Sequence, residues 1–254
     1  MSRQHFFLFP EAIQKDRVTF PDDISHQIIH VLRLKGGDEV LVLDDKGSQF
    51  AVRLEGVEKP PVTGCVIGQE PALGEPQTRI SLYFPLTRRD KLEWILQKGT
   101  EVGVASFHPF ISQRSLVQDQ AIKPGKKDRW LSILREAAEQ SGRGRIPALA
   151  DSVAFPSALD DALTSNAGIL TAWQDAPADL TKALSGLMIR LEADRSLAIF
   201  IGAEGGFSGE EMEAMHSRQV AFFTMGCRIL RMETAAILAP ALALMALGEM
   251  GLSE

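Results

Sequence analysis

The fold is decided by the stretch Leu197-Ala198-Ile199-Phe200-Ile201-Gly202-Ala203-Glu204-Gly205-Gly206, in which an apolar run leads directly into a glycine-rich turn. A second apolar run at residues 220–225 leads into another glycine turn that starts at Gly226. Between the two, Ser208 and Glu211 form a capping box, which predicts a helix starting near Gly209. The order strand, turn, helix, strand, turn, helix places parallel strands in one sheet, with both turns at the same carboxyl edge. Ligands bind at that edge in open α/β sheets, so we expect a site whose walls are largely backbone.

The chain from Arg79 onward continues the same alternation of strands and helices. Strands are predicted at 80–84, 104–110 and 168–173, and helices with one apolar side at 91–102 and 128–141. Such alternation is typical of an α/β domain with a mainly parallel sheet.

The N-terminal region has a different pattern, in which short strands replace the alternation. Residues 40–43 and 49–54 flank a loop containing Gly47, which is typical of a β-hairpin. Residues 23–33 have helical spacing. This region therefore resembles a small β-barrel with one helix.

A linker at residues 69–76, with two prolines and one glycine, separates the two patterns. At 254 residues the chain is long enough for one large or two modest domains. We therefore predict a β-barrel domain at residues 1–72 and an α/β domain at residues 73–254.

The longest apolar stretch, Thr234 to Gly248, has about 15 residues and contains Pro240, short of the roughly 20 that span a bilayer. We expect no membrane partner, and a buried helix that bends or restarts near Pro240. Because this helix is apolar nearly all round, it is also suited to packing against a second subunit. The two cysteines, Cys65 and Cys227, lie far apart and indicate a reduced, cytoplasmic protein.

The net charge of −6 by itself argues weakly against a nucleic-acid partner, but the charges are unevenly distributed. Residues 79–147 carry 13 Lys and Arg against 7 Asp and Glu, so one basic segment lies within an acidic chain. Local potential steers a polyanion better than net charge does, which favours an RNA partner. The alternative is a solvated surface with randomly distributed charge.

The first glycine turn has neither the spacing of a dinucleotide fingerprint nor that of a phosphate-binding loop. Glycines at 202, 205 and 206 instead permit close approach of the backbone and positive φ angles. A flat heterocycle such as adenine fits against such exposed backbone groups. The alternative is a tight turn that binds nothing.

The second turn is followed by Arg228, Arg231, Glu233 and Thr234, between an apolar strand and an apolar helix. One interpretation is a helix start in which the helix dipole favours Glu233 and Arg231 is its partner. The other assigns an arginine to an anionic group and the Thr234 hydroxyl to a ligand.

A third cluster follows a helix that is expected to end at Gly142, with Arg143 and Arg145 projecting from a flexible turn. This arrangement suits contact with backbone phosphates, or simply a helix end with arginines that complement the dipole. The histidines have no metal-ligand spacing, and no nucleophilic triad is evident, so no metal site is predicted.

Taken together, these motifs resemble the RsmE family of ribosomal RNA uridine methyltransferases, within the SPOUT class. The matching stretches occur in family order and cover nearly the whole chain: 30–33 with 37–38, 97–103, 113–115, 139–143, 201–208 and 226–235. Two positions depart from the family pattern, because Ala203 replaces a usual proline and Met232 replaces a usual threonine.

The resemblance implies a PUA-like N-terminal barrel, a C-terminal α/β domain with a deep trefoil knot, and a homodimer. It implies methylation of nitrogen 3 of one uridine in 16S ribosomal RNA or the small ribosomal subunit. It also implies that S-adenosylmethionine is held by Leu170, Ile201, Gly202, Glu204, Gly205, Gly206, Met225, Gly226, Ile229, Leu230 and Thr234. Catalysis is then assigned to Arg228, Arg231 and Glu233, and contact with RNA to Arg33, Arg114, Arg143 and Arg145.

Uridine nitrogen 3 carries a proton at neutral pH, so the site must accept that proton or stabilise the anion. Arg228 or Arg231 can stabilise the anion, and Glu204 or Glu233 can accept the proton. Two other functions stay open at this point: a non-catalytic RNA-binding protein, and a methyltransferase for another RNA position or a ribose hydroxyl. A nucleotide-dependent dehydrogenase is disfavoured, because the glycine fingerprint and the acidic ribose-binding residue are missing.

Overall fold

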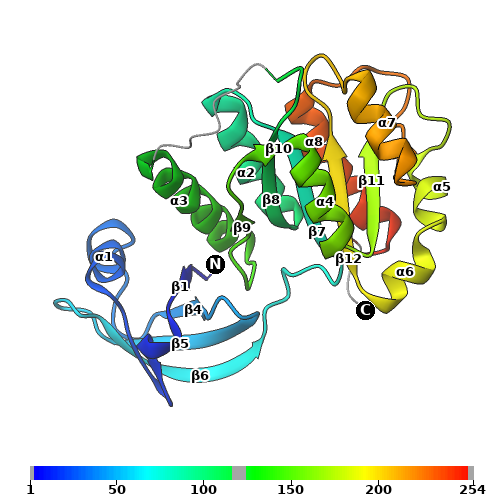
Figure 1. Ribbon diagram of the computed structural model, residues 1–254. Coiled ribbons are helices and arrows are strands. Elements are labelled where there is room, and N and C mark those ends of the chain that lie inside the picture. Colours follow the sequence, from blue (N-terminus) through cyan, green and yellow to red (C-terminus); the bar gives the residue numbers. More distant parts are fainter. Residues whose placement is uncertain (1–2, 116–123, 251–254) are drawn as a thin grey trace. The chain divides into compact units, whose positions relative to one another are not determined.

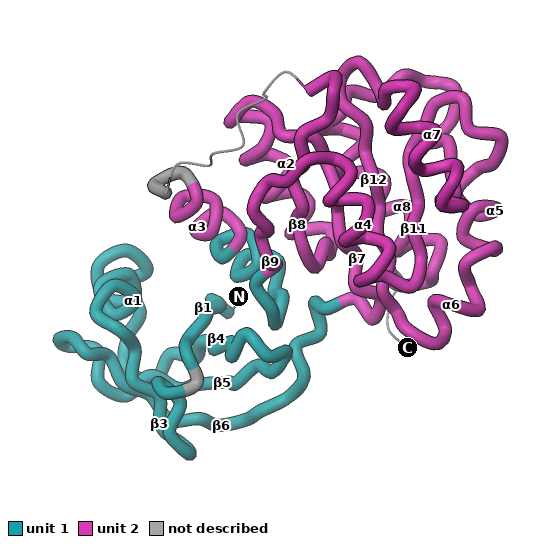
Figure 2. Tube along the Cα trace, in the orientation of Figure 1, with its two compact units in different colours: residues 1–75, 135–146 teal, residues 76–134, 147–254 magenta. Residues whose placement is uncertain are grey.

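The computed structural model describes residues 3–115 and 124–250 and contains two compact units (Figures 1 and 2). Unit 1 comprises residues 1–75 and 135–146, and unit 2 comprises residues 76–134 and 147–254. The division at 75/76 lies close to the predicted boundary at 72/73. Nothing in the sequence pattern indicated that residues 135–146 group with the N-terminal region.

Unit 1 is built on a curled six-stranded sheet with the order β1-β4-β5-β6-β3-β2. Its strands are β1 (His5–Phe7), β2 (Ile13–Gln14), β3 (Arg17–Thr19), β4 (Glu39–Leu43), β5 (Ser48–Gly56) and β6 (Thr63–Pro71). All neighbours are antiparallel except β1 and β4. A 3-10 turn (Pro10–Ala12), helix α1 (Asp22–His26) and a π-helical segment (Gln27–Val31) complete the N-terminal part. Its apolar core includes Phe6, Val18, Phe20, Ile28, Val40 and Val52.

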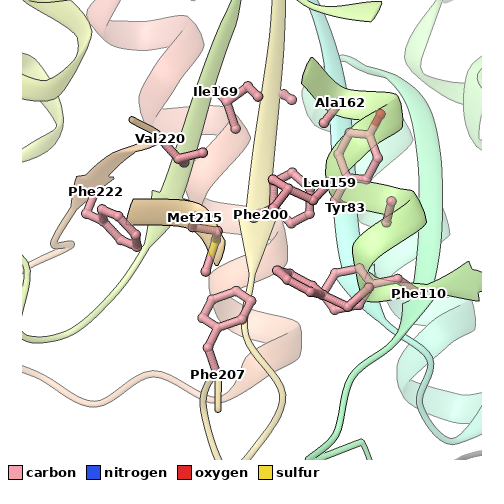
Figure 3. Packing of buried hydrophobic residues seen from close by; sticks show 13 residues of the cluster. Tyr83, Phe110, Leu159, Ala162, Ile169, Phe200, Phe207, Met215, Val220 and Phe222 are labelled. Atoms are coloured by element: carbon pink, nitrogen blue, oxygen red, sulfur yellow. The ribbon is translucent and has the colours of Figure 1, made fainter. Parts of the chain in front are cut away.

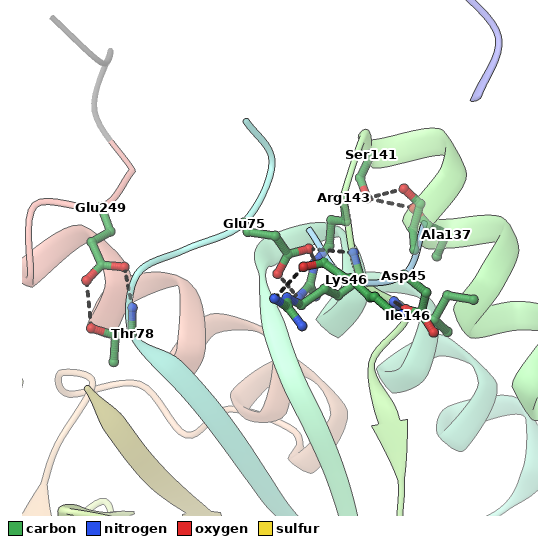
Figure 4. A network of polar contacts seen from close by, with 11 residues as sticks. Asp45, Lys46, Glu75, Thr78, Ala137, Ser141, Arg143, Ile146 and Glu249 are labelled. Carbon is green, nitrogen blue, oxygen red and sulfur yellow. Dashed lines mark hydrogen bonds and ion pairs between the residues drawn. The ribbon is translucent and has the colours of Figure 1, made fainter. Parts of the chain in front are cut away.

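The predicted β4–β5 hairpin is confirmed, and its turn is closed by a side chain. Asp44 Oδ1 accepts hydrogen bonds from the backbone N–H groups of Lys46, at 2.8 Å, and Ser48, at 2.9 Å. Short side chains of this type fold back on the local backbone and favour turns. The hairpin turn also receives residues 144–146, because Ile146 N donates to Asp45 Oδ1 at 2.7 Å (Figure 4).

Unit 2 is an α/β domain whose seven-stranded sheet is entirely parallel, in the order β10-β8-β7-β12-β11-β13 with β9 beside β8. The strands are β7 (Arg79–Pro85), β8 (Val104–Ile111), β9 (Ala148–Leu149), β10 (Val153–Ala154), β11 (Gly168–Ala172), β12 (Ser196–Ile201) and β13 (Ala221–Phe223). Its helices are α2 (Arg89–Val102), α4 (Phe155–Ser165), α5 (Leu180–Ser185), α6 (Met188–Ala193), α7 (Gly209–Ser217) and α8 (Met232–Ala246). Helix α3 (Pro124–Ser141) begins in unit 2, and its residues from Arg135 onward belong to unit 1. The predicted parallel sheet is confirmed.

The core of unit 2 explains why β12 is an unbroken apolar run. Every residue of β12 is buried, because helices cover both faces of the sheet. On one face, Phe200 stacks on Tyr83 at 4.5 Å between ring centres, and α4 and α7 close this cluster (Figure 3). On the other face, α8 packs against β7, β12 and α2. Both faces of the central strand are therefore packed up to the carboxyl edge, where the loops begin.

The ends of two helices test the local predictions. Helix α7 starts at Gly209 with the reciprocal capping box of Ser208 and Glu211, as predicted. Helix α8 starts at Met232, before the apolar stretch expected to form it, and it continues through Pro240 without restarting there. Among the described residues, no helix combines the length and the apolar character that crossing a membrane requires.

Candidate functional site

A cavity of about 790 Å³ lies at the carboxyl ends of β12, β11 and β13, entirely within unit 2. The strand register brings these ends together, because Ala172 of β11 pairs with Ile201 on one side and Phe223 on the other. Both glycine turns therefore line one cavity, which also receives the loop after β11. Its volume falls in the range of small-molecule and cofactor sites.

The first turn presents its backbone to the cavity. Gly206 N donates to the carbonyl of Ala203 at 2.8 Å, so the turn is closed by the main chain with alanine, and not a proline, at position 203. Gly206 has φ +72°, a conformation that strains most other residues. A Cβ at Gly202 would approach the Phe207 ring to 3.2 Å. The glycines at 202 and 206 thus keep this wall thin and its backbone groups accessible.

The second turn is tightened by a hydroxyl group. Thr224 Oγ1 accepts a hydrogen bond from Gly226 N at 3.2 Å, and Gly226 has φ +100°. The following residues, including Arg228 and Arg231, are exposed on the way to α8. Neither guanidinium has a hydrogen-bond or ion-pair partner in the described part of the chain, so both are available to an anionic group in the cavity that they line. Met232 is buried and also lines the cavity.

Lys91, at the start of α2, connects the first glycine turn with the start of α8, a feature that the sequence analysis missed. Its Nζ lies 3.0 Å from Glu204 Oε1 in the first turn and 3.1 Å from Glu233 Oε2 in the first turn of α8. The contact with Glu204 is a hydrogen bond, whereas the buried Glu233 oxygen makes an ion pair without hydrogen-bond geometry. Lys91 itself lines the cavity.

These contacts shift the titration of the cluster. Hydrogen bonding to Glu204 raises the pKa of Lys91, against the effect of burial, and Glu233 adds to the increase. Burial alone would raise the pKa of Glu233, but the bond to its own backbone N–H, together with Lys91 and Arg231, leaves this pKa below its ordinary value. At neutral pH the cluster therefore holds one ammonium and an ionised Glu233.

Arg114 reaches the cavity from the loop that follows β8. Its Nη1 donates to the carbonyl of Gly205 at 2.6 Å. The loop is anchored by the buried Glu211 carboxylate, which accepts from Ser112 Oγ at 3.2 Å and from Gln113 N at 3.1 Å. The residue that caps α7 therefore also fixes the position of Arg114 beside the first turn.

Most residues expected in the cofactor site line this cavity: Ile201, Gly202, Glu204, Gly205, Gly206, Met225, Gly226, Ile229 and Leu230, with Arg114, Arg228 and Arg231 around them. Leu170 and Thr234 do not line it. Leu170 is fully buried in the middle of β11, because the strand runs on to Ala172 before the loop begins. Glu233 does not line it either, but it pairs with Lys91, which does.

The loop after β11, residues 173–175, lines the cavity and was also missed. Its position at a strand end was the signal that could have identified it. Arg33, Arg143 and Arg145 belong to unit 1, outside the residues that line the cavity.

The expectation that Arg143 projects from a flexible turn is wrong. Its side chain is 2% exposed and forms a two-pronged pair with Glu75, Nε to Oε1 at 3.1 Å and Nη2 to Oε2 at 3.0 Å (Figure 4). Glu75 Oε1 also accepts from Arg145 N at 3.1 Å. Arg143 is therefore a structural residue of unit 1, whereas Arg33 and Arg145 are exposed. Within residues 3–115 and 124–250, no three His, Cys, Asp or Glu side chains gather as metal ligands.

The class of protein follows from comparison with known families. A family model described as an RNA methyltransferase domain matches residues 74–244, which include the whole cavity. Sequence relatives narrow the class. A ribosomal RNA small subunit methyltransferase E from Bacillus subtilis is 33% identical over 84% of both chains. A protein of the same name from Synechocystis is 27% identical over 89% of this chain and 72% of its own. The chain belongs to the ribosomal RNA small subunit methyltransferase E family.

Solved structures agree with this assignment. A ribosomal RNA small subunit methyltransferase E from Neisseria gonorrhoeae, bound to S-adenosylmethionine, superposes with a TM-score of 0.80 at 26% identity, covering 96% of this chain and 98% of the other. A putative methyltransferase from Legionella pneumophila, in complex with the same cofactor, has a TM-score of 0.77 at 26% identity, covering 97% and 98%.

Proposed function

We propose that this protein transfers a methyl group from S-adenosylmethionine to nitrogen 3 of a specific uridine in 16S ribosomal RNA. The observation that carries the proposal is the cavity walled by two glycine turns, with Arg228 and Arg231 at its side, neither of which forms an ion pair within 4 Å in the described part of the chain. Membership of the methyltransferase E family and the cofactor named in the Neisseria and Legionella structures support the choice of methyl donor. The uridine nitrogen is what the family resemblance implies.

The residues present fit this cofactor. The thin wall at Gly202, with Gly206 in a left-handed conformation, lets a flat base lie against the main chain, which a side chain at Gly202 would crowd. Ile201, Met225 and Leu230 supply apolar contact around it. When bound, S-adenosylmethionine supplies an electrophilic methyl group, so the protein mainly has to orient the acceptor and manage its proton.

The chemistry of the residues favours stabilisation of a uridine anion over a strong protein base. Arg228 and Arg231 are exposed and unpaired among the described residues, so they can offset the negative charge that develops as the proton leaves nitrogen 3. Glu233 is a poor acceptor for that proton because it does not line the cavity and forms an ion pair with Lys91, which also helps to lower its pKa. Glu204 lines the cavity and is the better placed of the two carboxylates for this role.

Contact with RNA is assigned to the exposed arginines. Arg114 lies in the cavity, and Arg33 and Arg145 provide cations on unit 1. Such contacts position the phosphate backbone without reading sequence. The proposal further includes a PUA-like fold for residues 1–72, a trefoil knot within residues 73–254, a homodimer and a cytoplasmic location, all of which the family resemblance implies.

The test is to map modified nucleosides in 16S ribosomal RNA from cells with and without the gene by mass spectrometry. We expect 3-methyluridine to disappear at one position and to return when the wild-type gene, but not an Arg228→Ala variant, is supplied. If a different base modification or a ribose methyl group is lost instead, the acceptor is that base or ribose and not nitrogen 3 of a uridine. An unchanged set of nucleosides, together with no binding of S-adenosylmethionine in calorimetry, would indicate a non-catalytic RNA-binding protein.

A further inference from the structure

Lys91 makes contacts that the binding of a methyl donor does not by itself require. It comes from α2, whereas its two partners belong to two different cavity loops. Glu204 lies in the turn after β12, and Glu233 lies beyond the turn after β13. Lys91 is thus the one described residue whose side chain forms ion pairs with both of these carboxylates.

The environment separates this cluster from an ordinary surface pair. The side chains of Lys91, Glu204 and Glu233 are 25%, 29% and 15% exposed, and one oxygen of Glu233 is fully buried. A single ion pair on the exposed surface contributes little to stability. Partly buried charges that form a network hold their side chains in one arrangement more strongly. Without a cation between them, the carboxylates of Glu204 and Glu233 would repel each other, which would separate the first glycine turn from the start of α8.

We propose that Lys91 is a positioning residue that holds the first glycine turn and the start of α8, which follows the second turn, at the separation required by the methyl donor. The inference rests on the proposed function, because it assigns a role in the same cavity. Arg231 is the N-cap residue of α8, two residues before Glu233, so the clamped segment also carries this arginine. Lys91 therefore acts on cofactor and substrate through the loops, without reacting itself.

The test compares Lys91→Met, which keeps the length of the side chain and removes its charge, with Lys91→Arg. Lys98→Ala is the matched control, because Lys98 lies on the same helix, pairs with Glu101 and does not line the cavity. Calorimetry measures the Kd for S-adenosylmethionine, and thermal unfolding shows whether each variant is folded.

We expect Lys91→Met to raise Kd and KM for S-adenosylmethionine at least tenfold, with a smaller change in kcat. Lys91→Arg should recover most of the affinity, and Lys98→Ala should match wild type.

A double-mutant cycle distinguishes clamping from a general loss of stability. If Lys91 acts through Glu204, then Glu204→Gln combined with Lys91→Met should cost much less affinity than the two single changes multiplied together. Additive losses, or wild-type affinity in Lys91→Met, would overturn the clamp while leaving the proposed function intact. If the wild-type protein binds no S-adenosylmethionine at all, the proposed function fails and the clamp fails with it.

Discussion

Arg228 and Arg231 both line the cavity, and neither forms an ion pair with a carboxylate among the described residues. An unpaired, exposed arginine adds little to stability, so its removal should affect chemistry alone. We expect Arg228→Ala to lower kcat/KM for RNA methylation by more than tenfold, with Tm unchanged. Methyl transfer from labelled S-adenosylmethionine, with circular dichroism as the folding control, measures both. If the variant turns over like wild type, Arg228 has no role in the reaction.

Arg143 illustrates the opposite case, an arginine whose role is structural. It is buried against Glu75, and removing one member of a buried pair leaves the other charge without compensation. We expect Arg143→Ala to lower the free energy of unfolding by about 3 kcal/mol. The exposed neighbour Arg145 is the control, and Arg145→Ala should cost well under half as much in urea denaturation. An Arg143→Ala variant of full stability that binds RNA with a reduced salt dependence would restore the phosphate-contact interpretation.

At the scale of elements, helix α7 connects stability to the site, because its cap also anchors the loop that carries Arg114. Ser208 Oγ accepts from Glu211 N at 3.2 Å, and Glu211 Oε2 accepts in return from Ser208 N at 2.8 Å. Removing a capping hydroxyl typically costs about 1 kcal/mol. We expect this loss for Ser208→Ala in chemical denaturation, while Ser185→Ala, at the exposed end of α5, should change little. Equal stability of the two variants would mean that the cap does not support α7.

Helices α2 and α3 are joined by Glu93, and this contact should make stability depend on pH. Hydrogen bonding to Arg129, with help from Arg89, lowers the pKa of Glu93 from 4.5 to about 2. A carboxylate whose pKa is depressed in the folded state contributes stability above its unfolded pKa and loses it as pH falls through the folded value. Because both arginines are more than half exposed, solvent screening limits the contribution to about 1 kcal/mol. We expect wild type to lose this amount between pH 4.5 and 2 relative to Glu93→Gln, as measured by urea unfolding at each pH. If the free energies of unfolding of wild type and Glu93→Gln change in parallel with pH, Glu93 does not make the expected contribution to stability.

At the scale of the whole molecule, the parts predicted from sequence are those fixed by neighbouring residues. The capping box, the hairpin turn at Asp44 and the glycine turns act over a few residues, and each lies where the sequence placed it. The parallel sheet followed from the alternation of elements. The strand order and the burial of Arg143 depend on pairings between segments that are distant in the sequence. The pattern of neighbouring residues does not predict such pairings. Lys91 was missed for the same reason, since 113 residues separate it from Glu204.

The C-terminal helix gives the last prediction, because its surface bears on the proposed homodimer. Small residues such as Ala236, Ala239 and Ala243 are buried, while Leu238, Leu242 and Met245 form an exposed apolar stripe at helical spacing. A stripe of this kind on a helix that packs beside α2 suits contact with a second copy of the chain.

We therefore expect wild type to sediment as a dimer and Leu242→Glu to sediment as a monomer, because a charge in an apolar interface leaves its carboxylate unpaired and desolvated. Ile189→Glu, which places the same charge on the exposed helix α6, is the control and should remain dimeric. Analytical ultracentrifugation at several concentrations measures the association. If wild type sediments as a monomer, the dimer proposal is wrong. If the Leu242→Glu variant sediments as a dimer, the interface does not include this face of α8.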